Sequence, residues 1–297
     1  MDIEIQTMLE KKAIEIVNIP TPGQYLSSIF LVPKKETGQR PVVNLKRLNK
    51  HIPDIHFKME SISLLKEMLQ QGNYMWKIDL KDAYFSVPLH KESQKYIRFQ
   101  WKGRLYQFLC LCFGLVPAPR IFTKLMKVPI SLLRRLNIRL IVFLDDILIL
   151  AKTFQEAEMT RNTLIFVLQH LGFTINFPKS MWKPVQLILF LGVEVDSLEL
   201  KSSLPKEKME NIVSQCQDLL KAKTVTVREL TQLVGRLSSA AIAVLPAPLQ
   251  YRAMQRQQIL ELSHQQDYDT PIILSKEVRE ELNWWIQNLH LSNSCCC

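Results

Sequence analysis

The sequence predicts a globular α+β fold on three observations. The chain has 297 residues, of which 47% are hydrophobic and 22% are charged, so it can bury sizeable cores and lacks the composition of a disordered protein. Apolar runs typical of strands alternate with helical patterns up to about residue 200. From Pro205 onward the patterns are helical only, which predicts a boundary between residues 1–200 and residues 201–297.

The first elements are two predicted hairpins with a helix and a strand between them. Residues 27–58 place the apolar runs SIFLVP and RPVVNL on either side of KKETGQ, which predicts a hairpin with exposed cations. ESISLLKEMLQQG then predicts a helix that ends before Gly72, and YMWKIDL predicts a strand. In YIRFQWKGRLYQF, strand-forming residues flank Lys102 and Gly103, the pattern of a two-residue hairpin turn.

The middle of the chain alternates helices with strand pairs. APRIFTKLMKVPISLLRRL predicts a helix that Pro129 should kink. In IRLIVFLDDILIL, two apolar runs lie so close together that Leu144, Asp145 and Asp146 must lie at or near a hairpin turn. TFQEAEMTRNTLIFVLQHLG predicts a helix with Gly172 as its stop, and ILFLGVEVD predicts a small strand pair.

The last hundred residues predict helices. These are PKEKMENIVSQCQDLLKA, TVRELTQLVGRLSS and SKEVREELNWWIQNL. Thr226 and Glu229 fit a capping box at the start of the second. Trp284 and Trp285 lie among apolar neighbours, so we interpret them as core or docking residues rather than as a stacking surface.

Charge and terminal sequence bear on partners and location. The formal net charge of +10 favours polyanionic partners such as nucleic acid, with an ordinary basic surface as the alternative. The N-terminal MDIEIQTMLEKK lacks the pattern of a signal peptide, and no apolar run is long enough to span a membrane. We therefore expect a soluble protein of the cytoplasm or nucleus that does not bind membranes. The six cysteines lack zinc-site spacing and are interpreted as buried or free thiols.

Three aspartates point to metal chemistry. Asp145 and Asp146 at the tip of an apolar hairpin would be poorly solvated and would repel each other unless a cation lay beside them. Mg²⁺ prefers such oxygen ligands, and two ions about 4 Å apart can stabilise the attacking and leaving oxygens of a phosphoryl transfer. Asp79, at the end of the strand in WKIDL, supplies a third carboxylate. A simple turn is the alternative for the Asp pair alone.

Five segments, in this order, give the chain its resemblance to reverse transcriptases. They are DLKDAYFSVPL, LCFGLVPAPRIF, FLDDILIL, LGFTINFPKS and FLG. The resemblance covers about residues 14–200 and implies a right-hand polymerase, with fingers and an antiparallel palm sheet in residues 1–200 and a helical thumb and connection-like segment in residues 201–297. The extension VGRLSSAAIAVLPAPLQYRAMQR and the later ELNWW look like DIRS-type tyrosine-recombinase retrotransposons, with an LTR-like element as the broader placement.

The resemblance also implies which residues carry the chemistry. Asp79, Asp145 and Asp146 would hold two Mg²⁺ ions, for which Mn²⁺ can substitute. Lys179 in NFPKS would donate a proton to the leaving pyrophosphate, with a solvated lysine as the alternative. Phe143 stands where the family usually has Tyr, so an aromatic ring is kept and only a hydroxyl is lost.

The implied nucleotide site combines cations, backbone donors and an aromatic ring. Cations would flank the triphosphate, N–H groups would face it, and a ring beneath the sugar would exclude a 2′-hydroxyl by repulsion. The alternatives are surface charge for the cations and core packing for the ring. The residues are Lys34, Lys35 and Arg40 as cations, Asp82 and Ala83 as backbone donors, Tyr84 as the ring, and Phe113 and Gly114 beside nucleotide and template.

Further residues would contact primer and template. Cys112 replaces the proline that the family usually has, which should loosen this turn. Arg120 would reach template phosphate or merely begin a helix, and FLG would form the primer grip. The implied primer and template residues are Arg120, Phe190, Leu191 and Gly192.

The implied function is template-directed DNA synthesis. A primer 3′-hydroxyl would attack a deoxynucleoside triphosphate, with an RNA or DNA template and a DNA primer as partners. One alternative is a decayed retroelement copy that only binds nucleic acid, favoured by Cys112, Pro129 and the CCC tail. The other is ribonuclease H by association with a downstream domain. We expect that domain, and a recombinase or integrase domain, to be absent from this chain.

Overall fold

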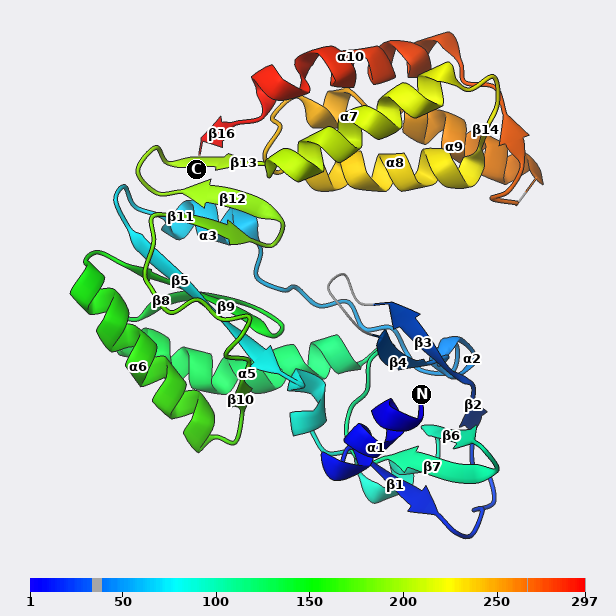
Figure 1. The fold of residues 1–297 in the computed structure, drawn as a ribbon, viewed down its shortest axis with the longest axis vertical. Coiled ribbons are helices and arrows are strands. Elements are labelled where there is room, and N and C mark those ends of the chain that lie inside the picture. The colour runs from blue at the N-terminus through cyan, green and yellow to red at the C-terminus, as the bar shows by residue number, and fades with distance from the viewer. Residues whose placement is uncertain (34–38, 266, 297) are drawn as a thin grey trace. The chain divides into compact units, whose positions relative to one another are not determined.

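The α+β prediction is confirmed by the computed structural model, which describes residues 1–33, 39–265 and 267–296 (Figure 1). The chain forms two compact units, each assembled from several segments. The first unit consists of residues 1–60, 77–149 and 158–182, and the second consists of residues 61–76, 150–157 and 183–297.

The first unit begins with helix α1 (Asp2–Glu10) and a sheet with strand order β1-β7-β6-β2. The predicted hairpin is confirmed, because Lys102 and Gly103 connect β6 to β7 with φ of 46° and 76°, the left-handed values that this turn requires. Phe99 and Tyr106 stack across it with ring centroids 5.3 Å apart. The strands are β1 (Ile14–Val17), β2 (Leu26–Ser27), β6 (Arg98–Trp101) and β7 (Arg104–Phe108).

The hairpin predicted in residues 27–58 is also confirmed. Strands β3 (Ile29–Pro33) and β4 (Gln39–Val43) pair in antiparallel register. Lys34 and Lys35 lie outside the described residues. Short helices follow in this part of the chain and later, namely α2 (Lys46–Asn49), α4 (Lys91–Gln94) and the 3-10 turn η1 (Ala83–Ser86).

A further sheet has strand order β10-β5-β9-β8 and carries the predicted aspartate hairpin. Its centre is apolar, and Ile78, Ile147, Leu148 and Ile149 are all fully buried. Helices α5 and α6 lie beside it in Figure 1. The elements are β5 (Tyr74–Lys81), β8 (Arg139–Phe143), β9 (Asp146–Ala151), β10 (Thr174–Ile175), α5 (Ala118–Arg135) and α6 (Phe154–His170).

Two predictions about these helices can be compared with the structure. Gly172 follows α6 with a φ of 87°, as expected for a helix stop. Pro129 is buried inside α5, and the helical residues continue on both sides of it. Because a proline removes one N–H, only the carbonyl of Leu125 loses its helical partner, so the helix continues beyond this point.

The second unit contains helix α3, a small sheet and the C-terminal helices. The strand pair predicted in ILFLGVEVD is confirmed as β11 and β12, joined by Leu191 and Gly192. The sheet has the order β11-β12-β13-β16. The elements are α3 (Ile62–Met68), β11 (Leu187–Phe190), β12 (Val193–Asp196), β13 (Lys201–Ser203), α7 (Lys206–Lys221), α8 (Val227–Ala240), η2 (Ala247–Leu249), α9 (Arg252–Gln265), α10 (Lys276–Ser292) and β16 (Cys295–Cys296).

The prediction of helices only after Pro205 is wrong in detail. Strand β14 (Val225–Thr226) pairs with β15 (Pro271–Ile272), and β16 joins the small sheet. Strands of two residues are too short to produce a recognisable alternation in the sequence. The capping box is confirmed, because the Thr226 side chain accepts from the N–H of Glu229 while the Glu229 carboxylate accepts from the N–H of Thr226.

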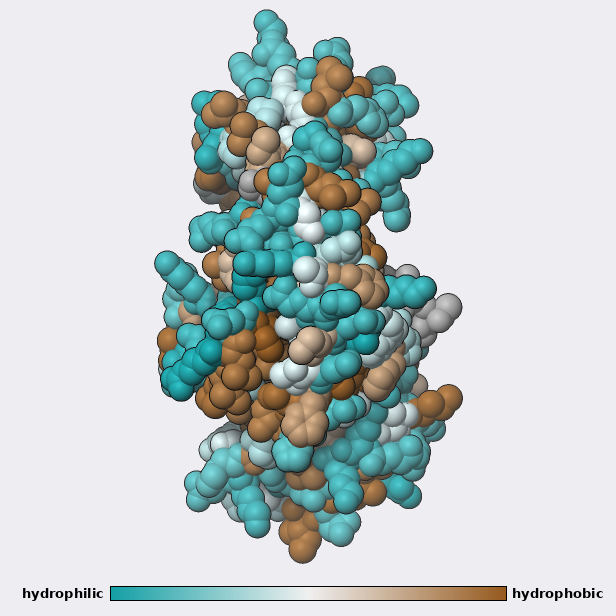
Figure 2. Space-filling model, turned by 90° about the vertical axis from the view of Figure 1, so that its left-hand side faces the viewer, coloured by the Kyte–Doolittle hydropathy of each residue, from teal (hydrophilic) through white to brown (hydrophobic). Residues whose placement is uncertain are grey.

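For Trp285, the interpretation of the tryptophan pair as core residues is confirmed, whereas Trp284 is half-buried. The Trp285 side chain is fully buried, and its Nε1 donates a hydrogen bond to the carbonyl of Gln250 at 2.7 Å. On the face shown in Figure 2, hydrophilic residues cover most of the surface, with hydrophobic residues gathered in several places. None of the helices in the described ranges combines the length and the apolar character needed to cross a bilayer.

Candidate active site

The predicted aspartates lie on neighbouring strands and their connecting turn in the first unit. Leu144 has a φ of 54° and makes the turn between β8 and β9, so that Asp145 lies at the tip and Asp146 begins β9. Strand β5 neighbours β9 in the sheet, and the N–H of Leu80 donates to the Asp145 carbonyl at 2.9 Å. This bond joins the tip of the hairpin to the strand that carries Asp79.

Asp79 is held in place by neighbours from another loop. The Asn176 side-chain amide donates to Asp79 Oδ1 at 2.6 Å, and the Asp79 N–H donates to Ser180 Oγ at 3.1 Å. The N–H of Asn176 also donates to the Asp79 carbonyl at 2.8 Å. Both neighbours belong to the NFPKS segment, so this motif orients the carboxylate in addition to presenting Lys179.

The environment of the hairpin disfavours the charged forms of Asp145 and Asp146. Burial raises the pKa of Asp146 to about 6, and repulsion from Asp145 and Asp79 adds to the effect of burial. Burial also raises the pKa of Asp145, with a further contribution from Asp79, while Lys179 favours the charged form of both. The cluster therefore favours a positive partner at neutral pH.

The chemistry of these donors fits a hard divalent cation. Three carboxylates offer only oxygen ligands, and two of them are partly desolvated. Within residues 1–33, 39–265 and 267–296, no three His, Cys, Asp or Glu side chains are already gathered around one point as a metal cluster. The charge pattern therefore fits the ion, whereas closer convergence of the side chains would have to accompany its binding.

We expect Asp146→Asn to stabilise the metal-free protein above about pH 7 and to have little effect below about pH 4. Asp146 has a folded-state pKa of about 6 against an ordinary value of 3.8, so between these values the native protein keeps a proton that the unfolded chain has lost. The stability of the parent chain thus falls as pH rises through this window, whereas that of Asp146→Asn does not. The expected difference is roughly 1–2 kcal/mol, since partial exposure of Asp146 reduces the cost of its charge in the folded state. Urea unfolding in EDTA at both pH values measures the gain, and an equal gain at both would contradict the explanation.

A cavity of about 730 Å³ lies at Asp79 and Asp145 and is lined with cations, whereas Asp146 is not among its described lining residues. Asp79 and Asp145 line it together with Lys11, Arg40 and Lys179. Of the cations predicted for the site, Arg40 of β4 and Lys179 of the NFPKS segment line this cavity, whereas Lys34 and Lys35 lie outside the described residues. The cavity thus combines cations that could neutralise the phosphates of a nucleoside triphosphate with carboxylates that could hold metal ions.

Lys11 is a cavity residue that the sequence analysis missed. It follows α1, and its Nζ lies 2.7 Å from Asp82 Oδ2. Asp82 has a φ of 53° and precedes η1, so that N–H groups at the start of this turn, including that of Ala83, lack a partner within the turn. Lys11 lies outside every recognised motif, and no local pattern marks it, because only the tertiary fold brings α1 to the acids.

Tyr84 and Phe113 form an aromatic pair beside the acids. Tyr84 is 8% exposed and packs edge-on against Phe113 and Phe122, with ring centroids 4.9 and 5.8 Å apart. Burial and the Asp145 charge raise the pKa of Tyr84 to about 12. Phe113 is 45% exposed and lines the cavity, so its ring is open to a ligand, whereas Tyr84 packs against it, is mostly buried and is not among the described residues that line the cavity.

The segment around Gly114 is held by a residue far away in the chain. Gly114 has a φ of 91°, which favours glycine. The Asn49 side chain donates to the Gly114 carbonyl at 2.8 Å and accepts from the N–H of Val116 at 3.1 Å. Cys112 is 2% exposed and packs in the core at the cavity wall. Asn49 therefore fixes this turn in a chain that lacks the usual proline.

The remaining predicted residues lie elsewhere. Arg120 is in the first turn of α5 and is not among the described residues that line the cavity. Phe190, Leu191 and Gly192 belong to the second unit. Phe190 is 1% exposed and is part of that unit's core, while Leu191 and Gly192 form the β11–β12 turn with φ of 48° and 77°. Phe143, the substitute for the usual tyrosine, ends β8 and is partly exposed.

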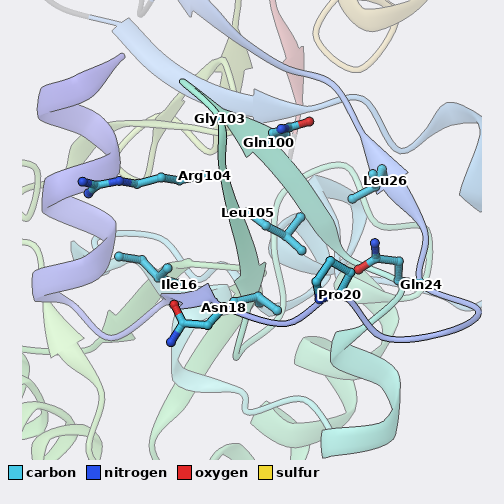
Figure 3. A pocket seen from close by; sticks show the side chains of 10 residues that line it. Ile16, Asn18, Pro20, Gln24, Leu26, Gln100, Gly103, Arg104 and Leu105 are labelled. Carbon is cyan, nitrogen blue, oxygen red and sulfur yellow. The ribbon is translucent and has the colours of Figure 1, made fainter.

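A second cavity, of about 530 Å³, is less suited to catalysis. It lies on the sheet of β1, β7, β6 and β2, where Figure 3 shows Ile16, Leu26 and Leu105 around it. Its polar lining includes Gln24 and Arg104, and none of its described lining residues is acidic. Without carboxylates it offers no charged ligands for Mg²⁺, so the cavity at Asp79 and Asp145 is the candidate active site.

Comparison with known sequences identifies relatives of the chain. Polyprotein P3 of Commelina yellow mottle virus is 24% identical over 251 residues, which are 81% of this chain and 13% of that protein. The Gag-Pol polyprotein of gibbon ape leukemia virus is 29% identical over 163 residues, which are 50% of this chain and 10% of that protein. The chain thus spans only about a tenth of the length of these relatives.

Solved structures show the same fold. The foamy viral protease-reverse transcriptase dRH in complex with double-stranded DNA matches 98% of this chain and 48% of that chain, with a TM-score of 0.76 and 20% identity. The foamy viral protease-reverse transcriptase in complex with an RNA/DNA hybrid matches 97% of this chain and 36% of that chain, with a TM-score of 0.70 and 20% identity. These likenesses confirm the right-hand polymerase fold.

The family assignment rests on the match to a family model. The family model described as "Reverse transcriptase (RNA-dependent DNA polymerase)" matches residues 32–195, more than half of the chain. These residues include Asp79, Asp145 and Asp146 and the loop that holds Asp79 in place. The chain therefore belongs to the reverse transcriptase family.

Proposed function

We propose that this chain synthesises DNA on an RNA or DNA template by two-metal nucleotidyl transfer, as the polymerase part of a retroelement polyprotein. The observation that carries the proposal is the meeting of Asp79 and Asp145 in one cation-lined cavity, in a member of the reverse transcriptase family. Template and DNA primer are the proposed partners, since the similar foamy viral structures are complexes with double-stranded DNA and with an RNA/DNA hybrid.

The roles of the acidic residues follow from their environment. Asp79, Asp145 and Asp146 would hold two Mg²⁺ ions, for which Mn²⁺ can substitute. Bound metal would stabilise charge on the attacking and leaving oxygens of the reaction. Asn176 keeps the Asp79 carboxylate oriented through its 2.6 Å hydrogen bond. Lys179 is exposed at the same cavity and would give its proton to the leaving pyrophosphate.

The roles of the nucleotide-site residues follow in the same way. Lys11 and Arg40, which line the cavity, would neutralise the triphosphate, and Lys34 and Lys35 are proposed to contribute further positive charge. The first N–H groups of η1 would face phosphate oxygens. The exposed ring of Phe113 would contact the nucleotide, while Tyr84 would exclude a 2′-hydroxyl.

The second unit is proposed to grip the duplex. Residues 201–297 include the amphipathic helices α7 and α8, which fit a thumb, while residues 1–200 would provide fingers and palm. Leu191 and Gly192, in the tight turn between β11 and β12, would contact the primer, and Arg120 would contact the template. The extension VGRLSSAAIAVLPAPLQYRAMQR supports an origin in a DIRS-type element.

Primer extension tests the proposal. The purified chain, an RNA template with an annealed DNA primer, the four deoxynucleoside triphosphates and Mg²⁺ should yield full-length DNA. Binding of the same template-primer should weaken as salt rises, because the lysine and arginine side chains of the protein release counterions from the phosphates on binding, and added salt opposes this release. Binding without extension would overturn the enzymatic proposal and would support a decayed retroelement copy that only binds nucleic acid.

We expect Lys11→Ala to raise KM for deoxynucleoside triphosphates about tenfold, because a charge-assisted contact with phosphate is lost. The neighbouring Lys12→Ala is the matched control, since Lys12 is an exposed lysine that is not among the described cavity residues. Steady-state extension with varied nucleotide measures both variants. Equal KM values for Lys11→Ala and Lys12→Ala would exclude a role for Lys11 in nucleotide binding.

A further inference from the structure

Strand β8 forms an edge of its sheet among the described residues. It is the first strand of the aspartate hairpin and ends directly before the turn at Leu144 and Asp145. An edge strand exposes N–H and C=O groups that another strand would otherwise bind. Leu140 and Val142 are two residues apart, so their backbone groups point to the same side of β8. Side chains bind both groups. Arg134 Nη2 donates to the Leu140 carbonyl at 2.9 Å, and the N–H of Val142 donates to Glu60 Oε2 at 2.8 Å.

These two side chains also bind each other. Arg134 Nη2 lies 2.6 Å from Glu60 Oε1, so the pair and the backbone of β8 form a closed ring of contacts. Arg134 belongs to the last turn of α5, and Glu60 lies in the segment that precedes α3. The pair therefore joins three parts of the chain at a point three residues before Asp145. We call it the Glu60–Arg134 bracket.

Packing alone does not fix this part of β8. A cavity of about 200 Å³ lies between α5 and the hairpin, lined by Met126 and Ile130 of α5 and by Val142 and Leu144. Glu60 and Arg134 line the same cavity. Leu140 and Ile141 are fully buried, whereas Val142 borders this unfilled space and is only half-buried, so the polar contacts of the bracket add to the packing that holds the strand there.

We infer that Glu60 is a positioning residue for the catalytic aspartates, acting through β8 and kept in place by Arg134. Its carboxylate accepts the hydrogen bond from Val142 that a neighbouring strand would otherwise accept, and this contact fixes the position of Leu144 and Asp145 at the end of β8. Reaction rates depend steeply on such placement, since a misplacement of about 1 Å can cost about 10²-fold. The inference rests on the proposed function, because it assigns the bracket a role in that reaction.

The expected signature is a loss of turnover without a loss of folding or nucleotide affinity. The Glu60 and Arg134 side chains are 26% and 39% exposed, and ion pairs this accessible contribute little to global stability. Neither residue lines the cavity at Asp79, among the described residues. Glu60→Ala should therefore lower kcat about tenfold and leave KM for deoxynucleoside triphosphates and Tm close to those of the parent chain.

Three variants and a control test the inference. Glu60→Gln keeps an oxygen that accepts from Val142, so it should retain more of kcat than Glu60→Ala. Arg134→Ala should resemble Glu60→Ala, and the double variant should be little worse than either, because both remove one unit. Glu199→Ala removes an exposed ion pair with Lys201 in the second unit and should leave kcat unchanged.

Amide hydrogen exchange gives a readout that is independent of activity. The Val142 amide should exchange faster in Glu60→Ala than in the parent chain, and at the parent rate in Glu199→Ala. Unchanged exchange at Val142, or an unchanged kcat in Glu60→Ala with an active parent, would overturn the inference. A fall of Tm in parallel with kcat would also overturn it, by showing a merely structural role. A parent chain without any extension activity would instead refute the proposed function.

Discussion

Asp145→Asn is expected to lower the rate of Mg²⁺-dependent primer extension by about 10³-fold or more while the chain remains folded. The amide has the size of the carboxylate but no charge with which to hold a divalent cation. Asp145 lies at the tip of the hairpin and lines the same cavity as Asp79, so its loss would remove one of the carboxylates proposed to hold the metal ions. Single-turnover extension with the parent and variant chains measures the loss.

Stability gives this prediction an internal check. Burial raises the pKa of Asp145, so the charged carboxylate is unfavourable in the folded state. A neutral Asn should therefore be tolerated, and the thermal midpoint of the metal-free variant at neutral pH should equal or exceed that of the parent chain. A variant that is both inactive and destabilised would point to damage to the hairpin rather than to loss of a ligand.

A matched substitution separates the site from general charge effects. Asp54→Asn removes the same charge from an exposed position of the first unit that is not among the described cavity residues. It should extend primers at the parent rate. Template-primer affinity should be nearly unchanged in both variants, because phosphate contacts supply most of it. Near-parental extension by Asp145→Asn would show that the catalytic site lies elsewhere.

Local residue chemistry made much of the fold predictable. The turn at Lys102 and Gly103 requires left-handed backbone, and its flanking residues favour strands, so a few residues determine the hairpin. The same holds for the capping box at Thr226, whose two hydrogen bonds involve residues three apart. The Asp145 hairpin was predictable because an apolar strand pair leaves few positions where adjacent carboxylates can lie.

Contacts between distant segments could not be predicted from the sequence. Lys11 pairs with Asp82, and Asn49 holds the turn at Gly114, although neither contact follows from residue spacing. Glu60 looks like any polar residue before a helix, and only the edge of β8 explains its carboxylate. Each unit is also assembled from segments that are far apart in the sequence, and no local residue pattern shows which distant segments pack together.

Tyr84→Ala is expected to reduce discrimination against ribonucleotides on the order of 10²-fold, measured as the ratio of kcat/KM for a deoxynucleotide and the matching ribonucleotide. The Tyr84 ring is fixed between Phe113 and Phe122, so it cannot move aside for an added hydroxyl. Removing the Tyr84 ring opens space beside the Phe113 ring. The gain should appear as faster ribonucleotide use rather than as slower use of deoxynucleotides.

Two variants separate the ring's shape from its hydroxyl and from its packing. With a pKa of about 12, the Tyr84 hydroxyl stays neutral at working pH, so Tyr84→Phe should keep nearly all of the discrimination. Phe122→Leu removes a ring that contacts Tyr84 from the buried side and should cost about 1 kcal/mol of stability with little effect on sugar choice. If Phe122→Leu relaxed discrimination as much as Tyr84→Ala does, general loosening of the aromatic cluster would explain the result. If only Tyr84→Ala relaxes it, selection against the 2′-hydroxyl resides in this one ring.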